Sequence, residues 1–321
     1  MTELLLLRHG KSDWGAGTDD YHRPLKNRGK RGAQRIGTWM WQQDVVPDHI
    51  ISSPATRARE TAYKAAKSMG LGVANVLLDE RVYLSSTDDL LEVLRACPAT
   101  THRAMLVGHN PSLEDLLTRL VSDTIAIPDD GKLLPTATLA RLELACEWDA
   151  VNTNCARLLS ITRASSLPKT FPWSAPHGDE QRPRPAYYYR QSSVIPYRLK
   201  KGKLDILVIA SSGNKHCVVP KGIHDPGLSA QESAAKEALE EAGARGTVDN
   251  ESLGSYTQEK WGATTRVEVF PMQVEELIPE AEWEETHRGR QWLPADKAIR
   301  KLKQPALGPM IRTLAARLKA D

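Results

Sequence analysis

The chain has 321 residues, which is more than one hydrophobic core usually organises, so its length predicts two domains. Forty per cent of the residues are apolar and 26% are charged, a composition typical of folded globular proteins. The 43 basic residues nearly balance the 40 acidic ones and leave a formal charge of +3. So small a charge argues against a nucleic-acid polymer as the partner, although it allows local basic pockets.

The cysteines and the apolar runs bear on where the protein works. The four cysteines form no C-x-x-C pair and have no metal-ligand spacing, so we expect free thiols in a reducing compartment. No run approaches the roughly 18 apolar residues of a membrane helix. The opening run, residues 4–7, is too short for the core of a signal peptide. The sequence therefore predicts a cytoplasmic protein without a membrane partner.

The first half alternates apolar strand segments with helical segments. The expected strands are residues 3–7, 49–52, 104–107, 139–145 and 157–162, and the expected helices are about 28–42, 54–69, 88–95 and 112–121. Strand–helix alternation predicts a layered α/β domain with a mostly parallel sheet over residues 1–164.

Polar motifs follow the first three of these strands. Arg8-His9-Gly10 ends the first strand, Ser53 to Arg57 follows the second, and a glycine, His109 and Asn110 follow the third. We expect Ser53 to cap the next helix and Arg57 to lie in its first turn. Because ligands bind at the carboxyl ends of strands in open α/β sheets, these motifs predict one shared site.

That set of side chains suits a phosphoryl group. Arginine guanidinium groups bind its oxygens, and the neutral imidazole of His9 attacks phosphorus to form a phosphohistidine that water hydrolyses. His109, if charged, would stabilise the equatorial oxygens in the transition state.

The ordered combination of these motifs with Arg23-Pro24-Leu25 resembles the histidine phosphatase superfamily, and within it the short SixA-type phosphohistidine phosphatases, over about residues 2–163. The resemblance implies a three-layer α/β phosphatase domain without a cofactor. It also implies His9 as the nucleophile, with Arg8, Arg57 and His109 as the phosphate pocket. For the proton donor, Glu80 and Asp13 are alternatives, and either carboxylate is as readily explained by surface solvation.

Between residues 165 and 185 the periodicity disappears, and five prolines alternate with polar residues. This composition predicts an extended linker between two domains. The alternative is a long surface loop inside one domain.

The second half, residues 186–321, has a different pattern. The expected strands are 193–198 and 204–210, forming a hairpin, and about 254–257 and 265–274, with a turn at 211–215. The expected helices are 230–242 and 307–318. This order predicts a mixed sheet covered by helices.

The helix at 230–242 carries three glutamates on one face. Ser229 and Glu232 form a capping-box pattern, and Gly243 is a natural stop. Glu237, Glu240 and Glu241 follow the i, i+3, i+4 rule and repel one another unless a cation lies among them. Carboxylate oxygens of this kind suit Mg²⁺ or Mn²⁺, whereas an ordinary solvated helix face is the plainer interpretation.

The preceding loop and this helix, from Gly222 to residue 244, resemble the Nudix box of MutT-like pyrophosphohydrolases, and the flanking strands extend the resemblance over about residues 187–318. It implies an α/β/α sandwich with a mixed sheet and the three glutamates as metal ligands. Two positions differ from the family: Leu228 stands where it has a glutamate, and Lys236 where it has an arginine. Those two positions support the loop–helix structure more than the chemistry.

Further residues are candidates for substrate and base. Residues 290–298 resemble the tail of Nudix enzymes that act on diphosphoinositol polyphosphates and dinucleoside polyphosphates. The basic side chains expected to meet such an anionic substrate are Lys215, Lys221 and Arg266, and the candidate general bases are Glu268, Glu284 and Glu285.

The sequence thus favours a bifunctional hydrolase of phosphorylated small molecules. In one alternative, the first domain dephosphorylates phosphohistidine on a protein and the second removes unwanted nucleotides. In another, one domain only binds phosphorylated ligands.

Overall fold

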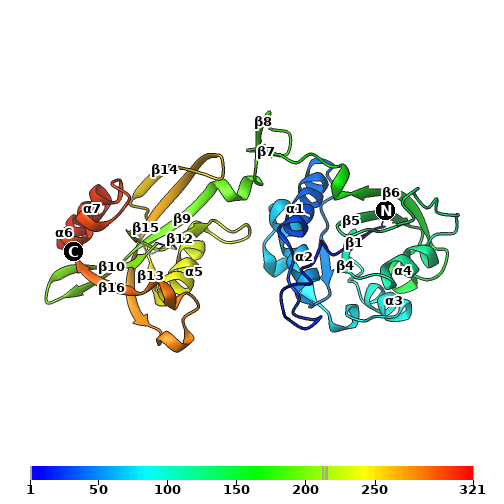
Figure 1. Ribbon diagram of the computed structural model, residues 1–321, viewed down its shortest axis with the longest axis horizontal. Helices are drawn as coiled ribbons and strands as arrows, with labels where there is room; N and C mark the ends of the chain where they lie inside the picture. Colours follow the sequence, from blue (N-terminus) through cyan, green and yellow to red (C-terminus); the bar gives the residue numbers. More distant parts are fainter. Residues whose placement is uncertain (1, 212, 214–215, 321) are drawn as a thin grey trace. The chain divides into compact units, whose positions relative to one another are not determined.

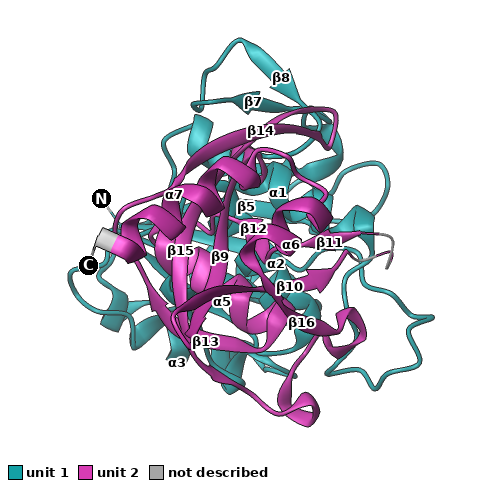
Figure 2. Cartoon of the chain, turned by 90° about the vertical axis from the view of Figure 1, so that its left-hand side faces the viewer, with its two compact units in different colours: residues 1–185 teal, residues 186–321 magenta. Residues whose placement is uncertain are grey.

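The computed structural model describes residues 2–211, 213 and 216–320 (Figure 1). The chain forms two compact units, Met1–Pro185 and Ala186–Asp321 (Figure 2). In the part of the chain that the structure describes, no helix is long and apolar enough to cross a membrane.

Unit 1 is built on a six-stranded sheet in the order β3-β2-β4-β1-β5-β6. Its strands are β1 (Thr2–Arg8), β2 (His49–Ser52), β3 (Val76–Leu78), β4 (Arg103–Gly108), β5 (Thr138–Leu144) and β6 (Ala156–Arg163). β3, β2, β4 and β1 run parallel to one another, whereas β5 is antiparallel to β1 and β6 is antiparallel to β5. The predicted mostly parallel sheet is confirmed; β3 was not predicted, because its three residues are too few for a periodic signal.

Helices cover both faces of this sheet, as the ribbon shows (Figure 1). They are α1 (Asn27–Gln42), α2 (Thr56–Ser68), α3 (Thr87–Arg95) and α4 (Ser112–Leu120). The strand residues Leu5 and Leu7 pack against α1 and α2, whereas Leu4 and Leu6 pack against α3 and α4. All four leucines are fully buried, since β1 is a central strand whose alternate side chains enter two cores. The three-layer architecture is therefore confirmed.

The predicted cap of α2 is wrong. The helix begins at Thr56, and Ala55 occupies its N-cap without a side-chain cap hydrogen bond. The Ser53 hydroxyl instead lies 2.8 Å from the ring of His109, although it also accepts a 3.3 Å hydrogen bond from the Ala55 amide. Arg57 lies in the first turn, as expected.

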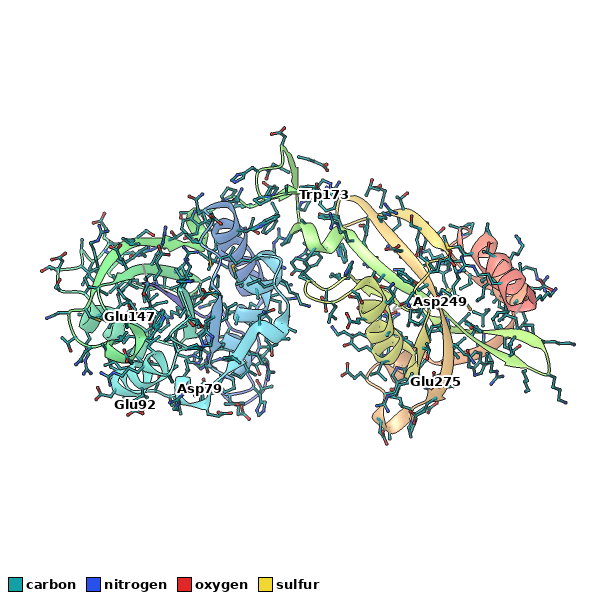
Figure 3. The ribbon with its side chains drawn as sticks, turned by 180° about the vertical axis from the view of Figure 1, so that it is seen from behind. Asp79, Glu92, Glu147, Trp173, Asp249 and Glu275 are labelled. Carbon is teal, nitrogen blue, oxygen red and sulfur yellow. The ribbon has the colours of Figure 1, made fainter. Side chains whose placement is uncertain are left out.

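Residues 165–185 belong to the first compact unit and form a two-stranded hairpin of β7 (Phe171–Trp173) and β8 (Glu180–Arg182). The Cζ atom of Arg182 lies 3.8 Å from the ring centroid of Trp173 (Figure 3). Phe171 is 1% exposed, and Arg31 of α1 lies over its ring. The interpretation of this segment as a linker between domains stays a prediction.

Unit 2 contains a mixed eight-stranded sheet. Its strands are β9 (Arg190–Lys200), β10 (Lys203–Ala210), β11 (Cys217–Val218), β12 (Lys221–Ile223), β13 (Ala244–Val248), β14 (Gly254–Lys260), β15 (Ala263–Leu277) and β16 (Arg290–Pro294). The main strand order is β11-β10-β9-β15-β13. In addition, β12 pairs with β9, β14 with β15 and β16 with β10. Among the described residues of unit 2, β9 and β15 form the one parallel pair of strands, and the β9–β10 hairpin is confirmed.

The sheet of unit 2 also lies between two helical layers (Figure 1). On one face, Ala234 and Ala238 of α5 (Ala230–Ala242) pack against β9 and β15. On the other face lie α6 (Ala295–Lys301) and α7 (Leu307–Ala320), which pack against alternate residues of the same strands. This arrangement confirms the α/β/α sandwich.

Limited proteolysis tests the division of the chain. Residues 174–181 are mostly exposed, so we expect a protease to cut first between residues 165 and 185 and to leave two folded fragments. Mass spectrometry of the fragments and their melting curves measure the outcome. Resistance to cutting in this segment, or fragments that do not melt cooperatively, would contradict the two-domain prediction.

Candidate active sites

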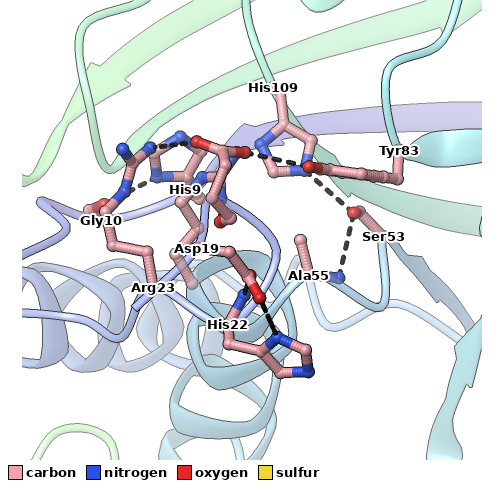
Figure 4. A network of polar contacts seen from close by, with 11 residues as sticks. His9, Gly10, Asp19, His22, Arg23, Ser53, Ala55, Tyr83 and His109 are labelled. Atoms are coloured by element: carbon pink, nitrogen blue, oxygen red, sulfur yellow. Dashed lines mark hydrogen bonds and ion pairs between the residues drawn. The ribbon is translucent and has the colours of Figure 1, made fainter. Parts of the chain in front are cut away.

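Three neighbouring parallel strands bring the residues of the first site together. β1 pairs with β4, and β4 with β2, in registers whose carboxyl ends coincide. The residues that follow these strands are His9, His109 and Ser53. The rings of His9 and His109 lie 5.1 Å apart between centroids, and His109 contacts the Ser53 hydroxyl (Figure 4).

The loop after β1 is held tightly against α1. A side chain at Gly29 would place its Cβ 2.3 Å from the Lys11 carbonyl oxygen, and one at Gly10 would meet the Gly29 carbonyl at 2.7 Å. The Gly10 amide also donates a 2.9 Å hydrogen bond to Thr61 Oγ1 of α2. Two glycines therefore allow the close backbone approach that fixes the position of His9.

His9 has the protonation state of a nucleophile. Its Nδ1 lies 2.7 Å from the Gly10 carbonyl oxygen, which can only accept, so Nδ1 carries the proton and Nε2 the lone pair. Burial, together with the nearby His109, Arg57 and Arg8, lowers the pKa of His9 to about 3, and the Gly10 hydrogen bond opposes this shift. The imidazole is therefore neutral at neutral pH.

His109 is also neutral before an anion enters. Burial, followed by the charge of Arg57, lowers its pKa to about 3. This differs from the charged form considered in the sequence analysis. A phosphate dianion beside the ring would raise the pKa again, because an opposite charge favours the protonated form.

In the described part of unit 1, several residues of the site have a buried polar atom without a hydrogen-bond partner. Within residues 2–211, the buried atoms that have no hydrogen-bond partner include Nε of Arg8, Arg23 and Arg57 and Nδ1 of His109. All four residues line a cavity of about 580 Å³ together with His9. Buried donors without partners are costly, so their concentration here indicates a pocket for an anion.

Asp20 is a pocket residue that the sequence did not identify. Its carboxylate lies 2.9 Å from both Arg57 Nη2 and Arg23 Nη2, and it accepts a 3.0 Å hydrogen bond from Tyr83. Burial raises the pKa of Asp20, but the Tyr83 hydrogen bond and the two arginines outweigh burial and hold it below its ordinary value. The aperiodic loop that carries Asp20 gives no spacing signal that singles it out.

The two carboxylates proposed from the sequence as proton donors lie outside the residues that line this cavity. Glu80 is exposed and accepts a 3.2 Å hydrogen bond from Tyr21. Asp13 accepts from the Gly15 amide and lies 3.4 Å from Lys26. Their roles stay predictions.

The second site is built on α5. The Ser229 hydroxyl accepts from the Glu232 amide at 3.1 Å, and the Glu232 carboxylate accepts from the Ser229 amide at 2.7 Å. Gly243 ends the helix in the left-handed conformation, with φ of 56°. The predicted capping box and stop are thus confirmed, and they set which face of the helix carries the glutamates.

The glutamates of this face all have a raised pKa, and burial is the largest cause for each of them. Burial, together with the charges of Glu241 and Glu240, raises the pKa of Glu237 to about 7. Burial also raises the pKa of Glu241, although its hydrogen bond from the Lys221 amide and the charge of Arg288 oppose this. Arg288 lies 2.7 Å from Glu241.

The donor set fits a hard divalent cation in its chemistry. A cation among the three carboxylates would favour their charged forms and offset the repulsion that Glu241 and Glu240 exert on Glu237. Gly222 leaves room for the Glu237 carboxylate, since a Cβ there would lie 1.8 Å from its Oε1. Among the described residues, however, no three His, Cys, Asp or Glu side chains stand in a ready metal-binding group. The Arg288 pair accounts for this in part, because it draws Glu241 toward a cation of the protein's own.

Asp225 supplies the carboxylate that the loop lacks at position 228. Lys236 Nζ lies 2.8 Å from Asp225 Oδ2, whose side chain is 12% exposed. The Asp225 amide donates to Ser233 Oγ at 3.1 Å, and Leu228 is 38% exposed. Loop and helix are therefore joined by an ion pair despite both departures in the sequence.

The remaining candidates of unit 2 occupy different places. Lys221 lies beside the glutamates: burial lowers its pKa, which Glu241 partly opposes. Lys260, which the sequence did not identify, lies near the same groups, since Lys221, Glu241 and Glu237 all shift its pKa. Arg266 and Glu268 alternate along β15 with buried residues of the far face, which puts them on the α5 side.

Of the three candidate bases, two lie near the glutamate helix. Burial is the largest cause of the raised pKa of Glu240, and Lys236 opposes it. Glu284 and Glu285 raise this pKa further. Glu285 also forms an ion pair with Arg288. Lys215 lies outside the described residues.

Both folds and both clusters of charged groups define a protein built to handle phosphate. Residues 4–82 match the model of the histidine phosphatase superfamily (branch 1), and residues 189–314 match that of the NUDIX domain. The chain is thus a histidine phosphatase superfamily domain fused to a NUDIX domain, a bifunctional phosphate hydrolase.

Known proteins resemble one half of the chain or the other. An uncharacterized protein of Mycobacterium tuberculosis is 29% identical over 159 residues, 48% of this chain and 98% of that protein. The chloroplastic Nudix hydrolase 21 of Arabidopsis thaliana is 35% identical over 131 residues, 38% of this chain and 63% of the plant protein. Among solved structures, the protein histidine phosphatase SixA with tungstate is 17% identical, with a TM-score of 0.44, over 51% of this chain and 98% of that chain. An Ap4A hydrolase of C. elegans is 22% identical, with a TM-score of 0.34, and the match covers 40% of this chain and 98% of that chain.

The pocket of unit 1 yields a prediction about Asp20. Asp20→Asn removes the charge that pairs with Arg57 and Arg23 and keeps the shape. Because an ion pair this exposed is worth up to about 1 kcal/mol, we expect inorganic phosphate to bind about fivefold more tightly. Calorimetric titration in chelator measures the affinity. Asp19→Asn is the matched control, since Asp19 pairs with His22 (Figure 4); equal effects of the two changes would contradict the prediction.

The raised pKa of Glu237 predicts how the stability of unit 2 depends on pH. A carboxyl with a folded pKa near 7 and an ordinary value of 4.5 stabilises the fold below pH 4.5 and loses that contribution as pH rises through about 7. In chelator, Glu237→Gln should therefore flatten this loss and melt above the wild type at pH 8. Scanning calorimetry from pH 5 to 8 measures it, with Glu232→Gln as the control. A variant that loses stability with pH as steeply as the wild type would refute the assignment.

Proposed function

We propose that unit 1 hydrolyses a phosphomonoester through a phosphohistidine on His9. The Nε2 lone pair of His9 forms a bond to phosphorus while the ester P–O bond breaks and the leaving oxygen takes a proton. Water then attacks phosphorus, the N–P bond breaks, and neutral His9 returns. The observation that supports this most is the Gly10 carbonyl, which holds the proton on Nδ1 of a buried, neutral imidazole.

The surrounding groups bind and stabilise the phosphoryl oxygens. Arg8 and Arg57 donate to them, since both have a buried Nε without a partner among residues 2–211. His109 takes up a proton as the dianion enters and then donates to it. Glu80 remains a candidate for protonating the leaving oxygen, and Asp20, which lines the pocket, joins it.

For unit 2 we propose cleavage of a phosphoanhydride in a dinucleoside polyphosphate, a nucleoside di- or triphosphate, or a diphosphoinositol polyphosphate. Glu237, Glu240 and Glu241 would hold Mg²⁺ or Mn²⁺, as Nudix hydrolases generally use divalent cations. The cation neutralises phosphate charge and activates water when it is bound. Lys221 and Arg266 bind the phosphates of the substrate.

The general base and the setting complete the proposal. Glu285 and Glu284 are preferred over Glu268 as the base, because both act electrostatically on Glu240. The four cysteines are free thiols, which supports a reducing, cytoplasmic setting.

The phosphatase proposal depends on His9. His9→Ala should abolish hydrolysis of para-nitrophenyl phosphate in chelator and leave metal-dependent anhydride cleavage largely intact. Incubation with ³²P-labelled substrate followed by an alkaline quench measures a base-stable label on the wild type, and its loss on later acid treatment identifies it as phosphohistidine. A label that persists in the variant would place the nucleophile elsewhere.

The metal proposal depends on a contrast within α5. Glu241→Gln removes a ligand charge at nearly constant shape. The rate of anhydride cleavage should therefore fall about 10²-fold, and the Mg²⁺ concentration needed for the half-maximal rate should rise. Glu232→Gln should have little effect, because glutamine can still accept from the Ser229 amide in the capping box. Initial rates across a Mg²⁺ series measure both variants. Equal losses, or full wild-type activity in chelator, would rule out the proposed metal site.

A further inference from the structure

A second pocket adjoins the phosphate pocket of unit 1. It has a volume of about 430 Å³ and shares Lys11 and Thr136 with the first pocket. Its other lining residues include Arg28 and Arg35 of α1, Arg163, which ends β6, and Lys169. In the part of the chain that the structure describes, no acidic residue lines it.

The basic groups of this pocket are largely uncompensated. Arg163 is paired, because it contacts Asp130 at 2.7 Å. Among the described residues, no ion pair joins Lys11, Arg28, Arg35 or Lys169 to an acid. Several like charges facing one cavity repel one another, so the arrangement destabilises the unliganded protein unless an anion enters.

Buried polar atoms in the wall of the pocket lack partners. Thr138 is 0% exposed, and its Oγ1 has no hydrogen-bond partner in the described chain. The buried Nε of Arg35 is likewise without one. Orphaned groups of this kind are rare inside proteins, and here a hydroxyl and a guanidinium share one wall.

The helix that contributes the two arginines adds to the positive potential. Its first turn has no acidic residue, and no side chain caps it. Arg28 thus lies at the positive end of the helix dipole, an unfavourable position for a cation unless an anion is nearby.

We propose that this second pocket binds a further phosphate group of the molecule whose first phosphate is transferred to His9. Lys11, which follows the nucleophile loop and lines both pockets, contacts both phosphates. The inference rests on the proposed phosphatase function and adds to it the class of substrate: a small molecule with at least two phosphate groups. A monophosphate would use only the first pocket.

The test compares two inhibitors of para-nitrophenyl phosphate hydrolysis by the full chain in chelator. Inorganic phosphate has one phosphate group, whereas tripolyphosphate has three linked groups and can offer a second one to the adjoining pocket, which shares Lys11 and Thr136 with the first. All proteins carry Glu241→Gln to silence unit 2. The variant Arg28→Gln/Arg35→Gln should weaken inhibition by tripolyphosphate at least tenfold more than inhibition by phosphate. Lys30→Gln/Lys64→Gln removes two charges from α1 and α2 outside the pocket and should change the two constants equally.

Two outcomes overturn the proposal: an unchanged tripolyphosphate constant, and equal weakening of both inhibitors. A calorimetric titration of tripolyphosphate into the full chain carrying His9→Ala and Glu241→Gln separates this inference from the proposed function. If the wild type proves inactive on para-nitrophenyl phosphate, the proposed phosphatase function is refuted. The second-pocket proposal still requires that Arg28→Gln/Arg35→Gln weaken the binding of tripolyphosphate at least tenfold in the calorimetric titration. If it does not, the second pocket is refuted as well.

Discussion

Both units hold groups of like charge at short distances, and the apolar packing beneath those groups must resist their repulsion. In unit 1, the guanidinium groups of three arginines lie together at the carboxyl ends of β1, β2 and β4, beside two neutral histidines. In unit 2, three glutamates crowd one face of α5. The strands under the first cluster are fully buried leucines, alanines and valines, and α5 is fixed by alanines pressed against β9 and β15. Rigid support of this kind keeps a site preorganised for its ligand.

The two units meet the same demand with opposite charges. Unit 1 gathers guanidinium groups around a histidine that burial keeps neutral. Unit 2 gathers three carboxylates on one face of α5, and a cation beside them would reduce the repulsion on Glu237. Under the proposed function, the first chemistry needs no metal and the second uses one. The fused chain would then carry both kinds of phosphate chemistry.

The sequence predicted the elements with strong periodicity and missed those without it. The strands around His9 and His109 and the helix with Glu237 emerge from apolar alternation, capping residues and glycine stops, all local signals. Asp20 and Lys260 could not be predicted, because their positions depend on long-range packing of a loop and a strand end. The prediction that Ser53 caps α2 was wrong for a physical reason. A serine before a helix is often the N-cap, but the helix begins after Ala55 and the Ser53 hydroxyl contacts the His109 ring.

The Asp225–Lys236 ion pair has a consequence for how chains of this kind are recognised. A pattern that requires glutamate and arginine at the positions of Leu228 and Lys236 would reject this sequence, although loop and helix are still joined by opposite charges. The carboxylate has moved three residues along the loop, and the cation has changed from guanidinium to ammonium. In this chain an ion pair between loop and helix is present although both residues of the sequence pattern differ, so a search that allows a nearby carboxylate and either basic residue would accept it.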